Sequence, residues 1–260
     1  MHPIVQRSLR AVLARLPRRL NGLLVRAAKD FVPDNVREQA GLLDAGWSLR
    51  NAAKNGLAPG AIIDVGACQG NWSLAAREIF PGAKFLLIEA NPECEAHLAD
   101  TVRRLPGAAY ERTLLGPCAA TAVPFFQMHE GSSVLPELTN APRRCVPLEM
   151  RTLDQVVGAH DLPGPWLLKL DVQGYELEVL KGGGETLARS EAVFLEVSFI
   201  PYNRDAPLFA EVVAWMRARG LVIYDLCSTR RRATDGALFQ GDVLFVREDS
   251  ALRATRPFYT

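Results

Sequence analysis

The chain has 260 residues, of which 48% are hydrophobic and 23% are charged, and its formal net charge is +1. These proportions are typical of soluble globular domains, so they exclude a wholly disordered chain and a collagen-like chain. A near-neutral charge is also unlike that of a protein whose whole surface binds nucleic acid, and we expect no nucleic-acid partner.

The five cysteines are widely spaced, and none of them forms a cluster with zinc-ligand spacing. We therefore expect reduced thiols, no metal site and a cytoplasmic location. No apolar run in the sequence approaches the ~20 residues of a membrane span.

The first 30 residues form a basic arm, with seven arginines and lysines against one acid, Asp30. Its apolar residues at helical spacing are Leu9, Val12, Leu13 and Leu16. Such a helix can make peripheral contact with an anionic membrane; the alternatives are packing on the flank of the domain and a homodimer contact. We predict a helical extension over residues 1–55, a folded domain over 56–250 and a C-terminal tail over 251–260.

Beyond the arm, short apolar runs alternate with helical patterns. The predicted strands are 61–65, 85–89, 108–115, 123–128, 145–150, 166–171, 192–197, 221–224 and 242–247, the last two joined by an arginine-bearing hairpin or loop. The predicted helices are 34–58, 72–79, one beginning after Asn91-Pro92, one opened by the capping box Thr152–Gln155, 175–180 and 208–219. Residues 129–142 are predicted to form an exposed loop. Strands and helices with short links predict an α/β fold with parallel pairing.

A glycine-containing turn follows the first strand, in the order Asp64-Val-Gly66-Ala-Cys-Gln-Gly70. A dinucleotide-binding turn would have closer glycines and a helix start aimed at a phosphate. A carboxylate at Asp64 would repel a phosphate but could bind an amino group or a hydroxyl. Glu89 ends the second strand, where a carboxylate can accept hydrogen bonds from a ribose diol. The pattern indicates S-adenosylmethionine as the cofactor; the alternative is that Asp64 is a cap and the glycines only form the turn.

Six segments resemble, in this order, those of the FkbM-type S-adenosylmethionine-dependent methyltransferases: IIDVGACQGNWS, LLIEANPE, TLDQV, LLKLDVQGYELEVLKG, FLEVSF and GDVLFV. The resemblance implies a class I (Rossmann-like) methyltransferase fold over 56–250. This fold is an open twisted sheet of seven strands, the last antiparallel, with helices on both faces. The resemblance also implies transfer of a methyl group to a hydroxyl of a sugar, a glycan or a glycosylated or polyketide-like small molecule.

The cofactor-binding residues expected on this basis are Asp64, Gly66, Ala67, Gly70, Asn71, Glu89, Ala90 and Asp171. Asp171 matches the acid that ends the fourth strand of the family's fold and lies beside the methyl donor. Many class I enzymes bind the adenine amine with an acid near the end of the third strand. Here that strand runs into Leu115-Gly116-Pro117, so the adenine contact is unassigned, with the loop 129–133 as a candidate.

Methyl transfer to an alcohol requires alignment of the reacting atoms and a general base within hydrogen-bond reach. The candidate catalytic residues are Asp171, Glu196 and His129, and the candidate substrate-binding residues are Lys169, Tyr175 and Tyr202. Each has a structural alternative, such as a helix cap for Asp171 or simple exposure for His129. Asp171, Glu176 and Glu196 could together hold a divalent cation, although we expect no metal.

Two other functions remain open. A methyltransferase could act on a protein or nucleic acid, with the basic arm docking the acceptor. Alternatively, the chain could be a non-catalytic cofactor-binding scaffold recruited to membranes through residues 1–30.

Overall fold

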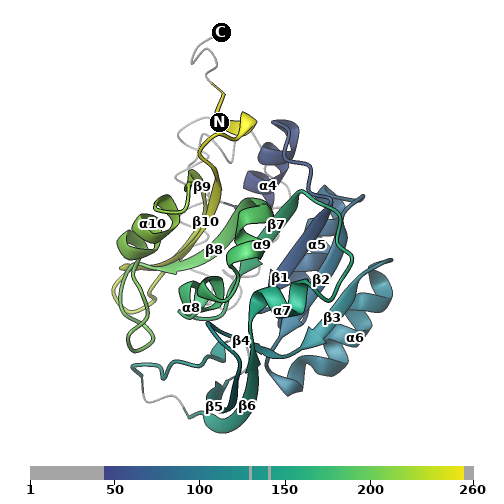
Figure 1. Ribbon diagram of the computed structural model, residues 1–260. Coiled ribbons are helices and arrows are strands. Elements are labelled where there is room, and N and C mark those ends of the chain that lie inside the picture. The colour runs from purple at the N-terminus through teal and green to yellow at the C-terminus, as the bar shows by residue number, and fades with distance from the viewer. Residues whose placement is uncertain (1–43, 129–130, 140–141, 255–260) are drawn as a thin grey trace, which may run out of the picture. The chain divides into compact units, whose positions relative to one another are not determined.

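Seven strands form one sheet in the computed structural model, which describes residues 44–128, 131–139 and 142–254 (Figure 1). The strand order is β3-β2-β1-β7-β8-β10-β9. The strands are β1 Ala61–Val65, β2 Lys84–Glu89, β3 Ala109–Arg112, β7 Trp166–Leu170, β8 Ser190–Ser198, β9 Leu221–Arg231 and β10 Leu238–Arg247. Strands β3, β2, β1, β7 and β8 pair in parallel, whereas β10 is antiparallel to both of its neighbours. The predicted seven-stranded sheet with an antiparallel last strand is confirmed.

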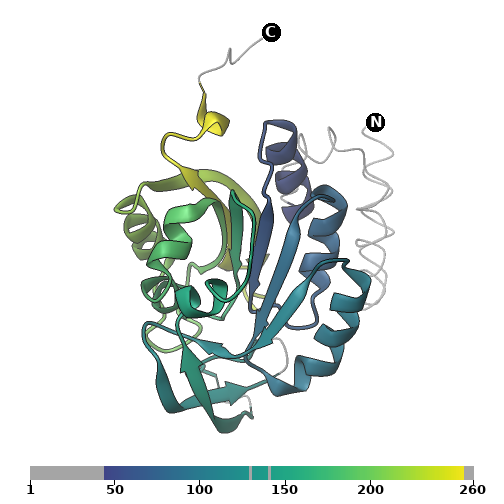
Figure 2. The ribbon, with the colours of Figure 1, turned by 45° about the vertical axis from the view of Figure 1, so that its right-hand side comes forward.

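Helices cover both faces of this sheet, as Figures 1 and 2 show. One face packs against α4 Ala45–Lys54, α5 Asn71–Ile79 and α6 Glu95–Arg104. The other packs against α7 Leu153–Val157, α8 Glu176–Lys181, α9 Gly184–Arg189 and α10 Phe209–Arg217. Two short 3-10 helices are η1 Pro92–Cys94 and η3 Ala251–Arg253. The architecture confirms the predicted α/β fold.

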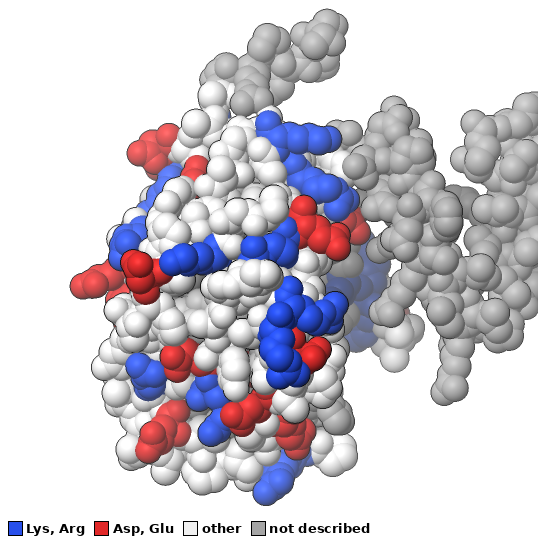
Figure 3. Space-filling model, turned by 90° about the vertical axis from the view of Figure 1, so that its right-hand side faces the viewer, with Lys and Arg blue, Asp and Glu red and all other residues white. Residues whose placement is uncertain are grey.

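Basic and acidic side chains are intermixed on the face that Figure 3 turns toward the viewer. This side of the molecule includes β3 and α6 (Figure 1). Arg112 of β3 lies 3.1 Å from Glu95 of α6, and Arg103 lies 3.0 Å from Asp100. Charges of opposite sign therefore balance each other locally there.

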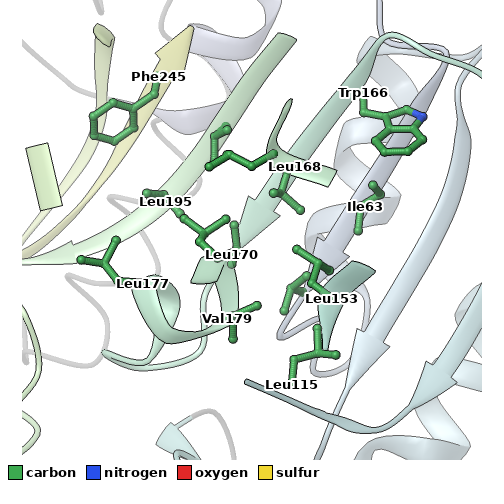
Figure 4. Packing of buried hydrophobic residues seen from close by; sticks show 14 of the residues in the cluster. Ile63, Leu115, Leu153, Trp166, Leu168, Leu170, Leu177, Val179, Leu195 and Phe245 are labelled. Carbon is green, nitrogen blue, oxygen red and sulfur yellow. The ribbon is translucent and has the colours of Figure 1, made fainter. Parts of the chain in front are cut away.

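The central strands read as continuous apolar runs because both of their faces are covered. In β1, Ile62 packs with the helices of one face, whereas Ile63 packs with those of the other, and every residue of the strand is buried. Figure 4 shows Ile63 and Leu168 near Leu153 of α7. Burial of this kind stabilises the sheet by roughly 25 cal/mol for each Å² of apolar surface removed from water.

A second, three-stranded sheet has the order β4-β6-β5. Its strands are β4 Leu114–Leu115, β5 Ala120–Gln127 and β6 Arg144–Arg151. The single strand predicted over 108–115 is wrong, because the chain leaves the main sheet at Thr113. The apolar pattern does not mark this change, since Ala109 and Leu114 continue it while pairing with strands of different sheets.

The loop predicted to be exposed over 129–142 is largely packed where the structure describes it. Ser133 is 1% exposed and pairs with Phe126 in an isolated β-bridge. Glu137 forms a buried ion pair with Arg143 and a bridge to Asn203. The prediction is wrong for this part, because contacts with distant segments bury a polar stretch.

The predicted N-terminal extension lies mostly outside the described residues, including the whole basic arm. Its last part forms α4, where Leu49 and Ala52 are buried against the sheet. Asp44 caps this helix by accepting a hydrogen bond from the Trp47 amide. Within residues 44–128, 131–139 and 142–254, no helix is long and apolar enough to cross a membrane.

Candidate active site

A cavity of about 300 Å³ opens at the carboxyl ends of β1, β2 and β7. The strand order runs from β1 to β2 in one direction and to β7 in the other, so the cavity lies where open α/β sheets bind ligands. Its lining residues are Val65, Gly66, Ala67, Cys68, Gln69, Asn71, Trp72, Ile88, Glu89, Ala90, Thr113, Leu114, Leu115, Phe125, Ser132, Ser133, Val134, Lys169, Asp171, Val172, Gln173, Tyr175 and Arg230.

The loop after β1 forms one wall of this cavity, and its glycines are required by contacts within the chain. Gly66 has a φ of 72°, and a Cβ there would overlap the carbonyl oxygen of Asp171. Gly70 has a φ of 77°, and its Cβ would lie 2.5 Å from Cγ2 of Thr101. Both conformations favour glycine. Gly66, Ala67 and Asn71 line the cavity, whereas Gly70 packs against α6 behind it.

Glu89 presents a carboxylate at the end of β2, and its residue is 8% exposed. Oε2 accepts a hydrogen bond of 2.8 Å from the Cys68 amide, and Oε1 accepts one of 2.7 Å from the Asn91 amide. Burial raises the pKa of Glu89, and these amide groups oppose that effect. Each carboxylate oxygen can accept a further hydrogen bond, so the group is able to bind hydroxyls in the cavity. The next residue, Ala90, also lines the cavity.

Asp64 differs from the expectation that its carboxylate faces the cofactor. It is fully buried beneath the loop and outside the cavity lining. Asp64 is paired with Lys169 across β1 and β7, and Nζ of Lys169 lies 2.9 Å from Oδ1. Ser73 donates a hydrogen bond of 2.6 Å to Oδ2. The same Lys169 ammonium group donates to the carbonyl of Gly66 at 2.9 Å, so Asp64 acts on the loop through Lys169.

Asp171 directly follows β7, Glu196 lies two residues before the end of the neighbouring strand β8, and the two carboxyl groups lie close together. The side-chain amide of Gln173 donates to Asp171 Oδ1 at 2.8 Å and to Glu196 Oε2 at 2.7 Å. Gln240 also donates to Glu196 Oε2, at 3.1 Å, and Arg230 lies 3.2 Å from its Oε1. Burial, followed by the charge of Asp171, raises the pKa of Glu196 well above its usual value. Of the two acids, Asp171 lines the cavity and Glu196 is outside its lining.

Glu176 is the first residue of α8 and is only 4% exposed, so its side chain is not solvated. Its Oε1 accepts hydrogen bonds from the amides of Val172 at 2.9 Å and Gly174 at 3.2 Å. Glu176 therefore stabilises the turn that carries Asp171. Among the residues that the structure describes, no group of three or more His, Cys, Asp or Glu side chains is placed to hold a metal ion.

Two of the three predicted substrate-binding residues line the cavity, and the third does not. Lys169 and Tyr175 line the cavity. Tyr202 lies outside the lining, with its ring centroid 6.3 Å from that of Phe239. His129 lies outside the described residues.

Sequence reasoning missed several residues of the site. Gln173 carried no signal beyond its place between a strand-ending acid and a helix. Arg230 belongs to the segment predicted as an arginine-bearing hairpin or loop, and that pattern does not point to the cavity. The segment Thr113–Leu115, together with Ser132 and Ser133, lines the region that follows the third strand, where the adenine contact was unassigned.

Solved structures with limited similarity include three methyltransferases. Methyltransferase FkbM from Methylobacillus flagellatus KT is 15% identical with a TM-score of 0.46, covering 72% of this chain and 43% of that chain. Precorrin-6y C5,15-methyltransferase from Geobacter metallireducens GS-15 is 12% identical with a TM-score of 0.42, covering 77% and 86%. Magnesium protoporphyrin IX methyltransferase from Synechocystis PCC 6803 is 11% identical with a TM-score of 0.41, covering 78% and 77%. The chain thus spans less than half the length of the Methylobacillus protein.

A search of curated proteins finds no match. The family described as Methyltransferase FkbM domain matches residues 64–223, which is more than half of the chain. The matched range contains the loop after β1, Glu89, Asp171 and Glu196. The chain belongs to the FkbM methyltransferase family.

Proposed function

We propose that the chain is an S-adenosylmethionine-dependent methyltransferase that acts on a hydroxyl of a sugar, a glycan or a glycosylated or polyketide-like small molecule. The observation that carries this proposal is the cavity at the ends of β1, β2 and β7. It has the Glu89 carboxylate on one side and the Asp171 carboxylate on the other. Membership of the FkbM family supports the same reaction.

The chemistry of the lining fits a nucleoside that carries an amino acid. Glu89 would accept hydrogen bonds from the ribose hydroxyls, and the small residues Gly66 and Ala67 leave backbone accessible along one wall. Asp171 offers a negative charge to a cationic group. When bound, S-adenosylmethionine supplies a methyl group on a positively charged sulfur.

An acceptor hydroxyl has a pKa far above 7, so its proton must pass to a base within hydrogen-bond reach. Asp171 is the carboxylate that both lines the cavity and is hydrogen-bonded by Gln173. We therefore assign proton acceptance to Asp171, with Glu196 as its neighbour outside the cavity lining. Lys169 lines the same cavity, but its ammonium group is paired with Asp64. We therefore assign it to holding the loop after β1 and not to binding an acceptor.

The charge pattern on one described face of the molecule is consistent with a small acceptor. A nucleic-acid partner requires a basic stripe or patch that follows its phosphates. On the face in Figure 3, basic side chains are instead interspersed with acidic ones.

Calorimetric titration with S-adenosylhomocysteine tests the cofactor site. Replacing Glu89 by Gln removes one charged acceptor, which is worth about 1.5–3 kcal/mol, so we expect affinity to fall by about 10-fold to 100-fold. Glu93→Gln is the matched control, because Glu93 is an exposed glutamate of η1 outside the cavity lining. If the folded wild type fails to bind, the proposal loses its foundation.

The acceptor class is tested by release of S-adenosylhomocysteine in the presence of a panel of glycosides. Each glycoside is paired with a derivative whose hydroxyls are already methylated. Release with a free hydroxyl, absent with the methylated partner and strongly reduced by Asp171→Asn, is the expected result. Any acceptor-dependent release also excludes a purely scaffolding role.

A further inference from the structure

Gln173 lies in the turn between β7 and α8, and its residue is 8% exposed. Its Nε2 atom is 2.8 Å from Oδ1 of Asp171 and 2.7 Å from Oε2 of Glu196. A primary amide nitrogen carries two N–H groups, so Gln173 has one donor for each carboxylate. The two acids, which come from neighbouring strands, are therefore joined through a single nitrogen atom.

The backbone of Gln173 is held in an unusual conformation by two other segments. Its φ of 57° lies in the left-handed region, which non-glycine residues rarely adopt. The carbonyl oxygen accepts hydrogen bonds from Ser133 Oγ at 3.0 Å and from Asn203 Nδ2 at 2.5 Å. Ser133 is 1% exposed and Asn203 is 3% exposed. Such strain persists only where the surroundings define the conformation, and it is typical of functional sites.

The bridged acids lie in a strongly charged environment. The groups that act on Asp171 or Glu196 are Lys169 of β7, Glu176 of α8, Arg230 of β9 and Asp242 of β10. Of these four groups, Lys169 and Arg230 are cations that oppose the repulsion between Asp171 and Glu196, whereas Glu176 and Asp242 are acids. Burial favours the uncharged form of Glu196, whereas hydrogen bonds donated to a carboxylate favour its ionised form.

We infer that Gln173 is a positioning residue, whose side-chain amide ties Asp171 to Glu196 and, by donating to its carboxylate, favours the ionised form of the buried Glu196. Gln173 acts through Asp171, the acid of the pair that lines the cavity. The inference rests on the proposed function only in the role given to Asp171. Because Ser133 and Asn203 hold the Gln173 carbonyl, the segments 131–139 and 200–207 are linked to the same pair.

The test is a pH titration of the Glu196 carboxyl carbon by NMR, using the full chain with ¹³C-labelled glutamate and no cofactor. Glu196→Gln identifies the signal. Gln173→Met keeps the length of the side chain but removes both N–H donors. We expect the apparent midpoint of Glu196 to rise by about one pH unit, a tenfold change in proton affinity, because the ionised form loses a donor.

Two further variants keep the result interpretable. Gln173→Asn suits the left-handed backbone, since Asn is enriched there, but its amide is one methylene too short to reach both acids. It should fold stably and raise the midpoint as Gln173→Met does. Gln155→Met is the matched control, because Gln155 is exposed on α7 outside the cavity lining, and it should leave the midpoint unchanged.

A midpoint that stays at the wild-type value in a folded Gln173→Met or Gln173→Asn protein overturns the inference. Binding of S-adenosylhomocysteine is measured in the same samples. A shifted midpoint in a chain whose wild type does not bind this compound supports the positioning role and refutes the proposed function. If the wild type binds S-adenosylhomocysteine but the Glu196 midpoint does not shift in the variants, the proposed function is supported and the positioning role is refuted.

Discussion

Nζ of Lys169 lies 2.9 Å from Oδ1 of Asp64, and the two side chains are 5% and 0% exposed. They face each other across β1 and β7, in the centre of the sheet. Burial lowers the pKa of Lys169, but the charges of Asp64 and Asp171 outweigh it and raise the pKa above its usual value. Because Lys169 also donates to the Gly66 carbonyl, this ion pair anchors the loop after β1.

Breaking this pair from one side is expected to be costly. Lys169→Met leaves the Asp64 charge buried without its partner, so we expect a loss of about 3–5 kcal/mol in the free energy of unfolding. The double variant Asp64→Asn/Lys169→Met removes both charges and should lose less than the sum of the single variants. Urea denaturation of the four proteins measures this coupling. Additive losses would show that the two groups do not stabilise each other.

Glu176 should make the protein less stable as the pH rises through the weakly acidic range. Burial raises the pKa of Glu176 to about 7, from an ordinary value of 4.5. Between these values the folded chain binds more protons than the unfolded chain, so stability is highest below this window and falls as the pH rises through it.

Glu176→Gln keeps an acceptor oxygen for the amides of Val172 and Gly174 but cannot ionise. We expect it to be more stable than the wild type at pH 8, by on the order of 1–3 kcal/mol, with little difference at pH 4.5. Urea denaturation of both proteins at several pH values gives the difference in their free energies of unfolding. Because the other acids are common to both proteins, this difference reports on Glu176. An equal gap at every pH would contradict the prediction.

Substitutions in the capping box at the start of α7 should lower the stability of the protein modestly without affecting the cavity. Thr152 Oγ1 accepts a hydrogen bond of 3.2 Å from the Gln155 amide, and Gln155 Oε1 accepts one of 3.1 Å from the Thr152 amide. Thr152→Ala should lower the free energy of unfolding by about 1 kcal/mol. Thr152→Ser, which retains the hydroxyl, should restore most of this loss. Affinity for S-adenosylhomocysteine should stay unchanged in both variants.

Thiol reactivity offers a test of the cofactor site without any substitution. Cys68 lines the cavity, with its Sγ 3.9 Å from that of Cys94, whereas Cys145 is exposed. S-adenosylhomocysteine should slow alkylation of Cys68 by iodoacetamide and leave the rate at Cys145 unchanged, as followed by mass spectrometry. Cys227 should stay unmodified in the folded protein, because its burial raises the pKa of the thiol to about 12. Equal rates at Cys68 with and without the ligand would place the ligand elsewhere.

Local patterns in the sequence were sufficient to predict the main elements of this protein. The apolar runs of β1, β2, β7 and β8 are predicted correctly because a strand buried on both faces is mostly apolar. The Thr152–Gln155 capping box and the Asn91-Pro92 helix start depend on neighbouring residues only, and both are present. The ends of the strands also mark Glu89, Asp171 and Glu196, since parallel strands present their carboxyl ends at one edge.

Tertiary structure alone decided which of these groups meet. The chain changes sheets at Thr113 because of pairing with β6, which lies far along the sequence. Asp64 faces Lys169 and not the cavity because the register of β1 and β7 places the two side by side. Gln173 joins Asp171 to Glu196 only when β7 and β8 are neighbours. Hydrophobic periodicity reports how deeply a residue is buried, whereas the partner of a buried polar group is set by contacts between distant segments.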